Sequence, residues 1–141
     1  MPTFQTFKDL SVTFKKHPVS DDLVQVKDKA AIVQSITALL LTSKGERPFQ
    51  PELGCGISRS LFEPLDYATA GMIRSEVASV LELYEPRITV DNIRVTPDEQ
   101  NNGYSVELFY TIVGRDDTPV AVEFFLERTR YALYSSCQSR L

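Results

Sequence analysis

The segment that decides the fold is Leu41–Glu63, L-T-S-K-G-E-R-P-F-Q-P-E-L-G-C-G-I-S-R-S-L-F-E, which places three glycines and two prolines between two apolar helical patterns. A flexible linker would be a featureless run of Gly and Ser. This segment instead carries apolar residues that can anchor it and charged residues that it can display: Phe49, Leu53, Ile57, Glu46, Arg47 and Glu52. We therefore expect a long shaped loop that presents side chains to a partner.

Two amphipathic helices are predicted, one on each side of this loop. Asp28 is the expected N-cap of a helix through Leu41, and Gly45 supplies its stop. Asp66 is the expected N-cap of a second helix that runs to Tyr84. The apolar residues of each helix fall on one face: Ala31, Ile32, Ile36, Leu39 and Leu40 in the first, and Met72, Ile73, Val77, Val80, Leu81 and Tyr84 in the second. Between them, Ser58–Phe62 is predicted to form a single short helical turn that ends before Pro64.

Three strands are predicted after Pro86 breaks the second helix. The first starts at Ile88, and a shift in its alternation predicts a bulge or bend at Asp91–Asn92. The next two, Tyr104–Ile112 and Val120–Leu126, alternate apolar and polar residues and are joined by polar turns. Helices followed by strands predict an α+β fold, in which two main helices and a short helical turn pack on a three-stranded antiparallel meander.

The 141 residues fit one globular domain. We expect an extended N-terminal arm over 1–27, a single α+β domain over 28–127 and a C-terminal tail over 128–141. The arm is expected to turn at His17-Pro18. Its period is compatible with either a helix or a strand, and we expect it to become ordered against a partner. The tail fits a short helix or an added edge strand equally well, and its interleaved Arg and Tyr residues favour docking to protein over RNA.

Charge is distributed unevenly along the chain. The net charge is -4, but residues 46–127 hold 15 acidic and 6 basic side chains, whereas both ends are basic. Nucleic-acid binding needs clustered Lys and Arg on a folded face, so the acidic body argues against it. The basic ends suit acidic protein surfaces, with ordinary solubility charge as the alternative. No apolar run approaches the roughly 18 residues of a membrane span, and no signal peptide is evident, so a soluble protein made in the cytoplasm is expected.

The sequence predicts no catalytic, cofactor or metal site. His17 has no second histidine or cysteine nearby, and Cys55 and Cys137 lie in no zinc-binding or disulfide pattern, so free thiols are expected. The remaining enzymatic option is a carboxylate pair for glycoside cleavage, drawn from Glu46, Glu52, Glu63, Glu82 and Glu85. The chain has 19 acidic residues, so close pairs arise by chance, and it has no Trp to form a sugar platform.

The tripeptide Glu85-Pro86-Arg87 has two interpretations. Pro86 fixes the backbone between the two charged residues, which could simply form a local salt bridge. Alternatively, they could join Glu46 and Arg47 in a polar cluster that recognises a partner. The residues themselves leave both interpretations open.

These segments carry a family resemblance. The run L-L-T-S-K-G-E-R-P-F-Q-P-E-L-G-C-G-I, followed by L-F-E and a helix that ends in Y-E-P-R-I, resembles the gene 25-like baseplate wedge family of contractile phage tails, with relatives in type VI secretion. The resemblance covers roughly Leu23 to Leu126. By position, Gly45 to Phe49 match one signature of the family, and Glu85 to Arg87 match its E-P-R element.

The resemblance implies a structural role rather than an enzymatic one. Similar proteins sit in the baseplate wedge of the virion tail beside the tail tube, bind a helical bundle of larger wedge subunits and start polymerisation of the sheath. The expected partners are therefore wedge subunits, the sheath protein, and the tube or hub, in a particle assembled in the host bacterial cytoplasm. The partner-binding residues that it implies are Glu46, Arg47, Pro48, Phe49, Glu85, Pro86 and Arg87. The family has also been labelled lysozyme-like, so a glycoside hydrolase acting on peptidoglycan is the alternative.

Overall fold

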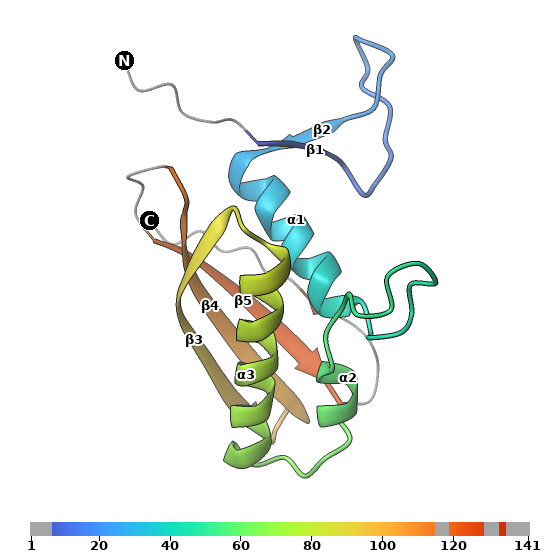
Figure 1. The fold of residues 1–141 in the computed structure, drawn as a ribbon. Helices are drawn as coiled ribbons and strands as arrows, with labels where there is room; N and C mark the ends of the chain where they lie inside the picture. The colour runs from blue at the N-terminus through green and yellow to red at the C-terminus, as the bar shows by residue number, and fades with distance from the viewer. Residues whose placement is uncertain (1–6, 115–118, 129–132, 135–141) are drawn as a thin grey trace.

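The computed structural model describes residues 7–114, 119–128 and 133–134. Along the chain it contains β1 (Lys8–Leu10), β2 (Gln25–Lys27), α1 (Asp28–Leu41), α2 (Ile57–Ser60), α3 (Tyr67–Tyr84), β3 (Ile88–Asp98), β4 (Gly103–Ile112), β5 (Val120–Glu127) and β6 (Leu133–Tyr134). Figure 1 shows both long helices on one face of the main sheet and the β1–β2 hairpin beyond one end of it. The predicted α+β fold is confirmed.

The main sheet is an antiparallel meander in the order β3-β4-β5-β6. The three long strands are those expected from the sequence, and the register between β3 and β4 shifts between Val90 and Asn92, which confirms the bulge. Of the two possibilities for the tail, the edge strand is present, because Leu133 and Tyr134 pair with β5. Cys137 lies outside the described residues.

Helix boundaries follow local sequence signals with small differences. α3 begins after Asp66, whose carboxylate accepts a hydrogen bond of 2.7 Å from the backbone N–H of Thr69. This bond holds the pKa of Asp66 below its usual value and confirms the predicted N-cap. α1 was expected to have Asp28 as its cap, but the N-cap is Lys27, which makes no side-chain capping bond. α2 starts and ends slightly earlier than predicted, at Ile57 and Ser60.

The core lies between the helices and the sheet. All five predicted core residues of α1 are buried, as are alternate residues of β4 from Tyr104 to Ile112. Burying an aliphatic or aromatic side chain of this size contributes about 1.5–3 kcal/mol. Met72 is an exception, because half of its side chain is exposed although the periodicity placed it on the buried stripe.

Among the described residues, no helix has the length and apolarity that a membrane span requires.

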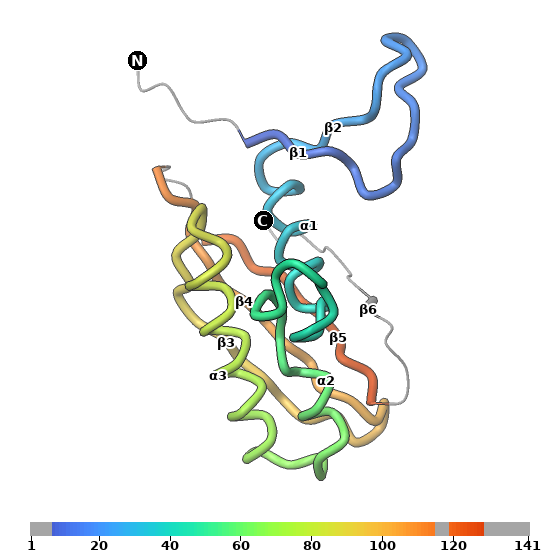
Figure 2. The backbone as a smooth tube through the Cα atoms, turned by 45° about the vertical axis from the view of Figure 1, so that its right-hand side comes forward, coloured from blue at the N-terminus to red at the C-terminus, as the bar shows by residue number. Residues whose placement is uncertain are grey.

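The N-terminal arm turns where its sequence predicted, at His17-Pro18, and the backbone N–H of His17 donates to Asp22 over 2.7 Å. The pairing of its two halves was not predicted: β1 pairs antiparallel with β2, with Lys8 opposite Lys27 and Leu10 opposite Gln25. The tube in Figure 2 shows this hairpin standing beyond the N-terminal end of α1. A two-stranded hairpin is marginally stable alone in water, so contacts with the body must hold it. Those contacts involve Arg87 and are described below.

Candidate functional site

The loop after α1 is fastened at its base. The backbone N–H of Cys55 donates to the carbonyl oxygen of Thr42 over 2.7 Å, and that of Gly45 donates to Pro51 over 2.8 Å. Ser43 and Cys55 also form a parallel β-bridge. These bonds close the chain into a compact loop with a fixed tip, in place of a flexible connection.

Glycines make this closure possible. Gly54 has φ of +125°, a region that residues with a Cβ rarely adopt. A Cβ at this position would collide with the carbonyl oxygen of Thr42, the atom that accepts the hydrogen bond from Cys55. Gly45 also has a positive φ of +87° but open space around it. The absence of a side chain at Gly54 therefore allows the two ends of the loop, at Thr42 and Cys55, to hydrogen-bond to each other.

The tip of the loop displays a short group of side chains, which we call the tip residues: Glu46, Arg47, Pro48 and Phe49. The carboxylate of Glu46 accepts a hydrogen bond of 3.0 Å from the backbone N–H of Ser43 and so stabilises the turn. Arg47 and Pro48 are exposed, and Phe49 is 97% exposed. An exposed phenylalanine beside an arginine combines two residue types that are enriched at protein interfaces.

The end of α3 carries the second predicted site. Glu85 is only 2% exposed, and its two carboxylate oxygens accept hydrogen bonds of 2.6 and 2.7 Å from Nε and Nη2 of Arg87. The remaining Nη1 of Arg87 donates to Asp9 over 3.1 Å, and its guanidinium lies 5.7 Å from the centre of the Phe7 ring. Pro86 is exposed between them. The E-P-R tripeptide thus links α3 to the N-terminal hairpin.

Electrostatics follow from this geometry. Burial alone would raise the pKa of Glu85, but hydrogen bonds from Arg87 and Ser35 and the positive charge of Arg87 outweigh burial and lower it. The same hydrogen bond to Glu85 raises the pKa of Arg87 against the opposing effect of burial. Both groups are therefore ionised near neutral pH, which suits a bidentate ion pair.

The local salt bridge, one of the two interpretations of Glu85 and Arg87, is present. The loop reaches the same end of α3 through Tyr84, whose hydroxyl donates to the carbonyl oxygen of Glu52 over 2.9 Å. The side-chain bonds of Glu46 and Arg87 run in different directions, to Ser43 and to Asp9. The loop therefore contacts this end of α3 through Tyr84, whereas Glu46 bonds Ser43 and Arg87 bonds Glu85 and Asp9.

Sequence reasoning missed Asp9 and Phe7 as partners of Arg87. Asp9 lies 78 residues before Arg87 in the chain, and no spacing rule joins residues so far apart. The only signal was the alternation around β1, which places Phe7 and Asp9 on the same side of the strand.

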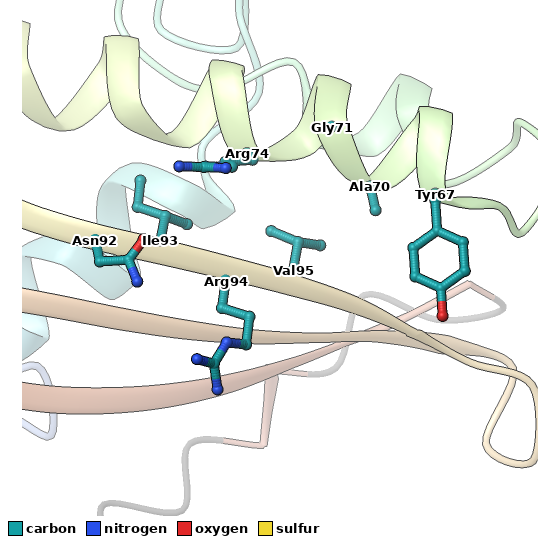
Figure 3. Close-up of a pocket in the computed structure, with 8 residues that line it drawn as sticks. All are labelled: Tyr67, Ala70, Gly71, Arg74, Asn92, Ile93, Arg94 and Val95. Atoms are coloured by element: carbon teal, nitrogen blue, oxygen red, sulfur yellow. The ribbon is translucent and has the colours of Figure 1, made fainter.

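A shallow groove of about 300 Å³ lies between α3 and β3. Its lining contains two arginines and one tyrosine but no carboxylate: Tyr67, Ala70, Gly71, Arg74, Asn92, Ile93, Arg94 and Val95. Figure 3 shows Arg74 between the helix and the strand, whereas Arg94 points away from the helix. Arg94 pairs with Glu107 at 3.2 Å. Over the parts of the chain that the structure describes, no group of three His, Cys, Asp or Glu residues is placed to hold a metal ion.

Comparison with known proteins identifies the class. The sequence pattern of the family "Baseplate wedge protein gp25" matches residues 26–117, so the chain belongs to this family of structural baseplate proteins. Over 87 residues it is 33% identical to baseplate wedge protein gp25 of Enterobacteria phage T4, a match that covers 62% of this chain and 66%, just under two thirds, of the T4 protein. The expected family is confirmed.

Solved structures share the fold. A protein of Geobacter sulfurreducens, described as a candidate tail lysozyme, is 28% identical with a TM-score of 0.64, and the match covers 77% of this chain and 99% of that one. A chain of the anti-feeding prophage baseplate has a TM-score of 0.68 at 18% identity, covering 79% of this chain and 90% of that one. A chain of the pyocin R2 baseplate after contraction has a TM-score of 0.56 at 24% identity, covering 70% and 96%. The last two comparisons concern the fold alone.

Proposed function

We propose that this chain is a structural wedge subunit of a contractile tail baseplate, which joins other wedge subunits near the tail tube and initiates sheath assembly. It acts in the virion tail baseplate, after synthesis and assembly in the host bacterial cytoplasm. The partners of this proposal are a helical bundle of larger wedge subunits, the sheath protein, and the tube or hub. Membership of the gp25 family over residues 26–117 supports it.

The proposal that this chain binds a wedge subunit rests on one observation: the tip residues are exposed on a loop whose base is held by hydrogen bonds. Arg and aromatic residues dominate the energetics of protein interfaces, and a rigid loop loses little conformational entropy when it binds. Phe49 and Arg47 combine both properties, because the hydrogen bonds of Gly45 and Cys55 hold the loop base in place. Arg47, Pro48 and Phe49 are therefore proposed to contact the wedge partner directly.

The Glu85-Pro86-Arg87 tripeptide contributes to the same proposal in a different way. Pro86 is exposed and can touch a partner, whereas Glu85 is buried and acts by holding the guanidinium of Arg87. About a quarter of the Arg87 side chain remains accessible, at 23%. In this proposal, Glu46 and Glu85 orient their neighbours, and Arg87 presents its accessible edge.

The test is reconstitution of the wedge from purified subunits. Phe49→Ala and Arg47→Ala should remain folded by circular dichroism and bind the wedge subunits at least tenfold more weakly, as expected for interface hot spots. Phe62→Ala removes an equally large side chain that is 80% exposed and lies just after α2, outside the tip residues, and it serves as the matched control. Equal binding by Phe49→Ala and Phe62→Ala would remove the tip from the interface.

Sheath initiation is proposed to use the free edge of β3. This strand is 11 residues long, and within the described sheet it pairs on one side only, with β4. The opposite edge is partly occupied by β6. Exposed strand edges are templates for strand addition, and the groove beside β3 supplies Arg74 to an acidic incoming segment. A chain truncated after Arg128 should therefore still nucleate sheath, whereas Arg74→Glu should slow nucleation. If truncation stops nucleation and Arg74→Glu leaves its rate unchanged, the sheath docks on the tail instead.

We also propose that the chain is not an enzyme. Glycoside cleavage needs a carboxylic acid with a raised pKa, whereas the pKa of Glu85 is lowered, and Glu46, Glu52, Glu63 and Glu82 are exposed. The description of the Geobacter relative keeps peptidoglycan hydrolysis as the alternative. The purified chain should leave the turbidity of a peptidoglycan suspension unchanged. Clearing that Glu46→Gln abolishes would establish the hydrolase instead.

A further inference from the structure

The β1–β2 hairpin has two chemically different faces. Phe7 and Asp9 point towards Arg87 on the inner face, and Val26, opposite Asp9, shares that face. Because side chains alternate along a strand, the neighbouring positions form the outer face. The outer face consists of Lys8, Leu10, Leu23, Gln25 and Lys27, all exposed.

The outer face combines cations with apolar surface. Leu10 is 54% exposed and Leu23 is 38% exposed, and the adjoining loop adds the exposed side chains of Val12, Phe14 and Val19. No acidic residue lies among the five positions of the outer face. Several exposed apolar side chains on one short segment, bordered by charge, are typical of an interaction site.

Two like charges lie directly opposite each other on this face. Lys8 and Lys27 are register partners, an arrangement that is unfavourable in an isolated sheet. The nearby Lys16 is neutralised by Asp21 at 2.8 Å, but Lys8 and Lys27 have no carboxylate partner among the described residues. Carboxylates from a binding partner would relieve this repulsion. A basic partner would be repelled by the two lysines, and a nucleic acid would be repelled by the acidic body of the chain.

The hairpin is also held in one orientation. Arg87 fastens its inner face, the backbone N–H of Asp28 donates to Phe7 over 2.8 Å, and the side chain of Gln34 on α1 bonds the backbone of Leu10 and Val12. The backbone of the outer face is therefore already held in place, which lowers the entropy cost of binding. Lys8, Leu10 and Leu23 precede the matched family region, which starts at residue 26.

We propose that the outer face of the hairpin docks an acidic segment with an apolar side, contributed by another baseplate subunit. This inference rests on the proposed baseplate role, and it adds a second contact at the opposite end of α1 from the tip residues. The leucines cover the apolar side of the partner segment, and Lys8 and Lys27 pair with its carboxylates.

Site-specific photo-crosslinking in assembled baseplates tests this proposal. Benzoylphenylalanine replaces Leu10, and mass spectrometry identifies the peptide that it captures. The expected product joins Leu10 to a segment of a different baseplate chain that carries at least two Asp or Glu residues together with apolar ones. A product with a second copy of this chain, a product with a segment that lacks acids, or no product overturns the inference. The same probe at the exposed Glu123 on β5 is the positional control.

A charge reversal separates pairing from general electrostatics. Lys27→Glu should lower the crosslink yield at least tenfold, whereas Arg59→Glu, an equal change at an exposed site on α2, should leave it within twofold. Equal losses in both variants contradict the proposed pairing. The amount of this chain in each particle is measured in parallel. If the chain is absent from baseplates, the proposed function is refuted. If it is present but does not form the expected crosslink, only the proposed docking on the outer face is refuted.

Discussion

Arg87 binds Asp9, a residue 78 positions earlier in the chain, through a hydrogen bond of 3.1 Å between Nη1 and Oδ2. The same guanidinium holds the buried Glu85 through its other nitrogens, so one side chain joins α3 to the N-terminal hairpin. A residue that was predicted to bind a partner thus also stabilises the fold of the chain itself. Substitution of Arg87 is therefore expected to change the stability of the domain.

Loss of Arg87 should destabilise the whole domain. Arg87→Ala leaves the buried carboxylate of Glu85 without its bidentate partner, and breaking such a pair costs about 3 kcal/mol or more. Asp9→Asn should cost less than about 1 kcal/mol, because Asp9 is 38% exposed. Urea denaturation gives both free energies of unfolding. Similar losses for the two variants would contradict the central position of Glu85.

Acid should weaken the fold through Glu85. Its pKa is lower in the folded chain than its ordinary value of 4.5, because the hydrogen bonds and charge of Arg87, with Ser35, outweigh burial. The unfolded chain therefore takes up this proton first as the pH falls. Its contribution to the free energy of unfolding is complete above about pH 4.5 and declines as the pH drops through the folded-state pKa. Denaturation at a series of pH values should show a shallower acid dependence in Glu85→Gln than in the parent chain.

Gly54 should tolerate no side chain. Gly54→Ala places a Cβ against the carbonyl oxygen of Thr42 at a φ of +125°, so we expect a loss of about 2 kcal/mol or more. Gly71 is the control, since it lies in α3 with open space around it. Gly71→Ala should raise the free energy of unfolding by about 0.5–1 kcal/mol through helix propensity. Thermal melting compares the two, and a neutral Gly54→Ala would contradict the tight loop base.

Cys55 should be an unreactive thiol in the folded protein. Burial raises its pKa from 9.0 to about 11, so the thiolate that alkylating reagents attack becomes about a hundredfold rarer at pH 8. A Cys137→Ser variant isolates Cys55 for the measurement. Alkylation by iodoacetamide should be slow in buffer and fast in urea. Rapid labelling under native conditions would mean that the base of the loop opens readily.

Local patterns account for most of the architecture. The apolar stripe of α1, the capping bond of Asp66, the alternation from Tyr104 to Ile112 and the bulge near Asp91 all depend on residues a few positions apart, and each is confirmed. Met72 and Asp28 were assigned wrongly, because near the end of a stripe or helix the packing of neighbouring elements outweighs local preference.

Membership of the baseplate wedge family was also encoded in short runs of sequence, since the two signatures flank α3 and resemble known relatives. The tip residues follow from the same kind of reasoning. Glycine and proline spacing predicts a shaped loop, and the exposure of Phe49 agrees with a loop that displays its side chains. Their role in binding stays a prediction for the reconstitution experiment.

The sequence by itself determined which segments become helices and strands and which family the chain resembles, because hydrophobic period, capping and turn chemistry act over a few residues. Tertiary structure alone decided that the two halves of the arm pair as β1 and β2 and that Arg87 is shared between Glu85 and Asp9. Arg87 and Asp9 are 78 positions apart, and they meet only because the folded chain brings them together. A hydrophobic period covers a few residues, so it cannot predict such a contact.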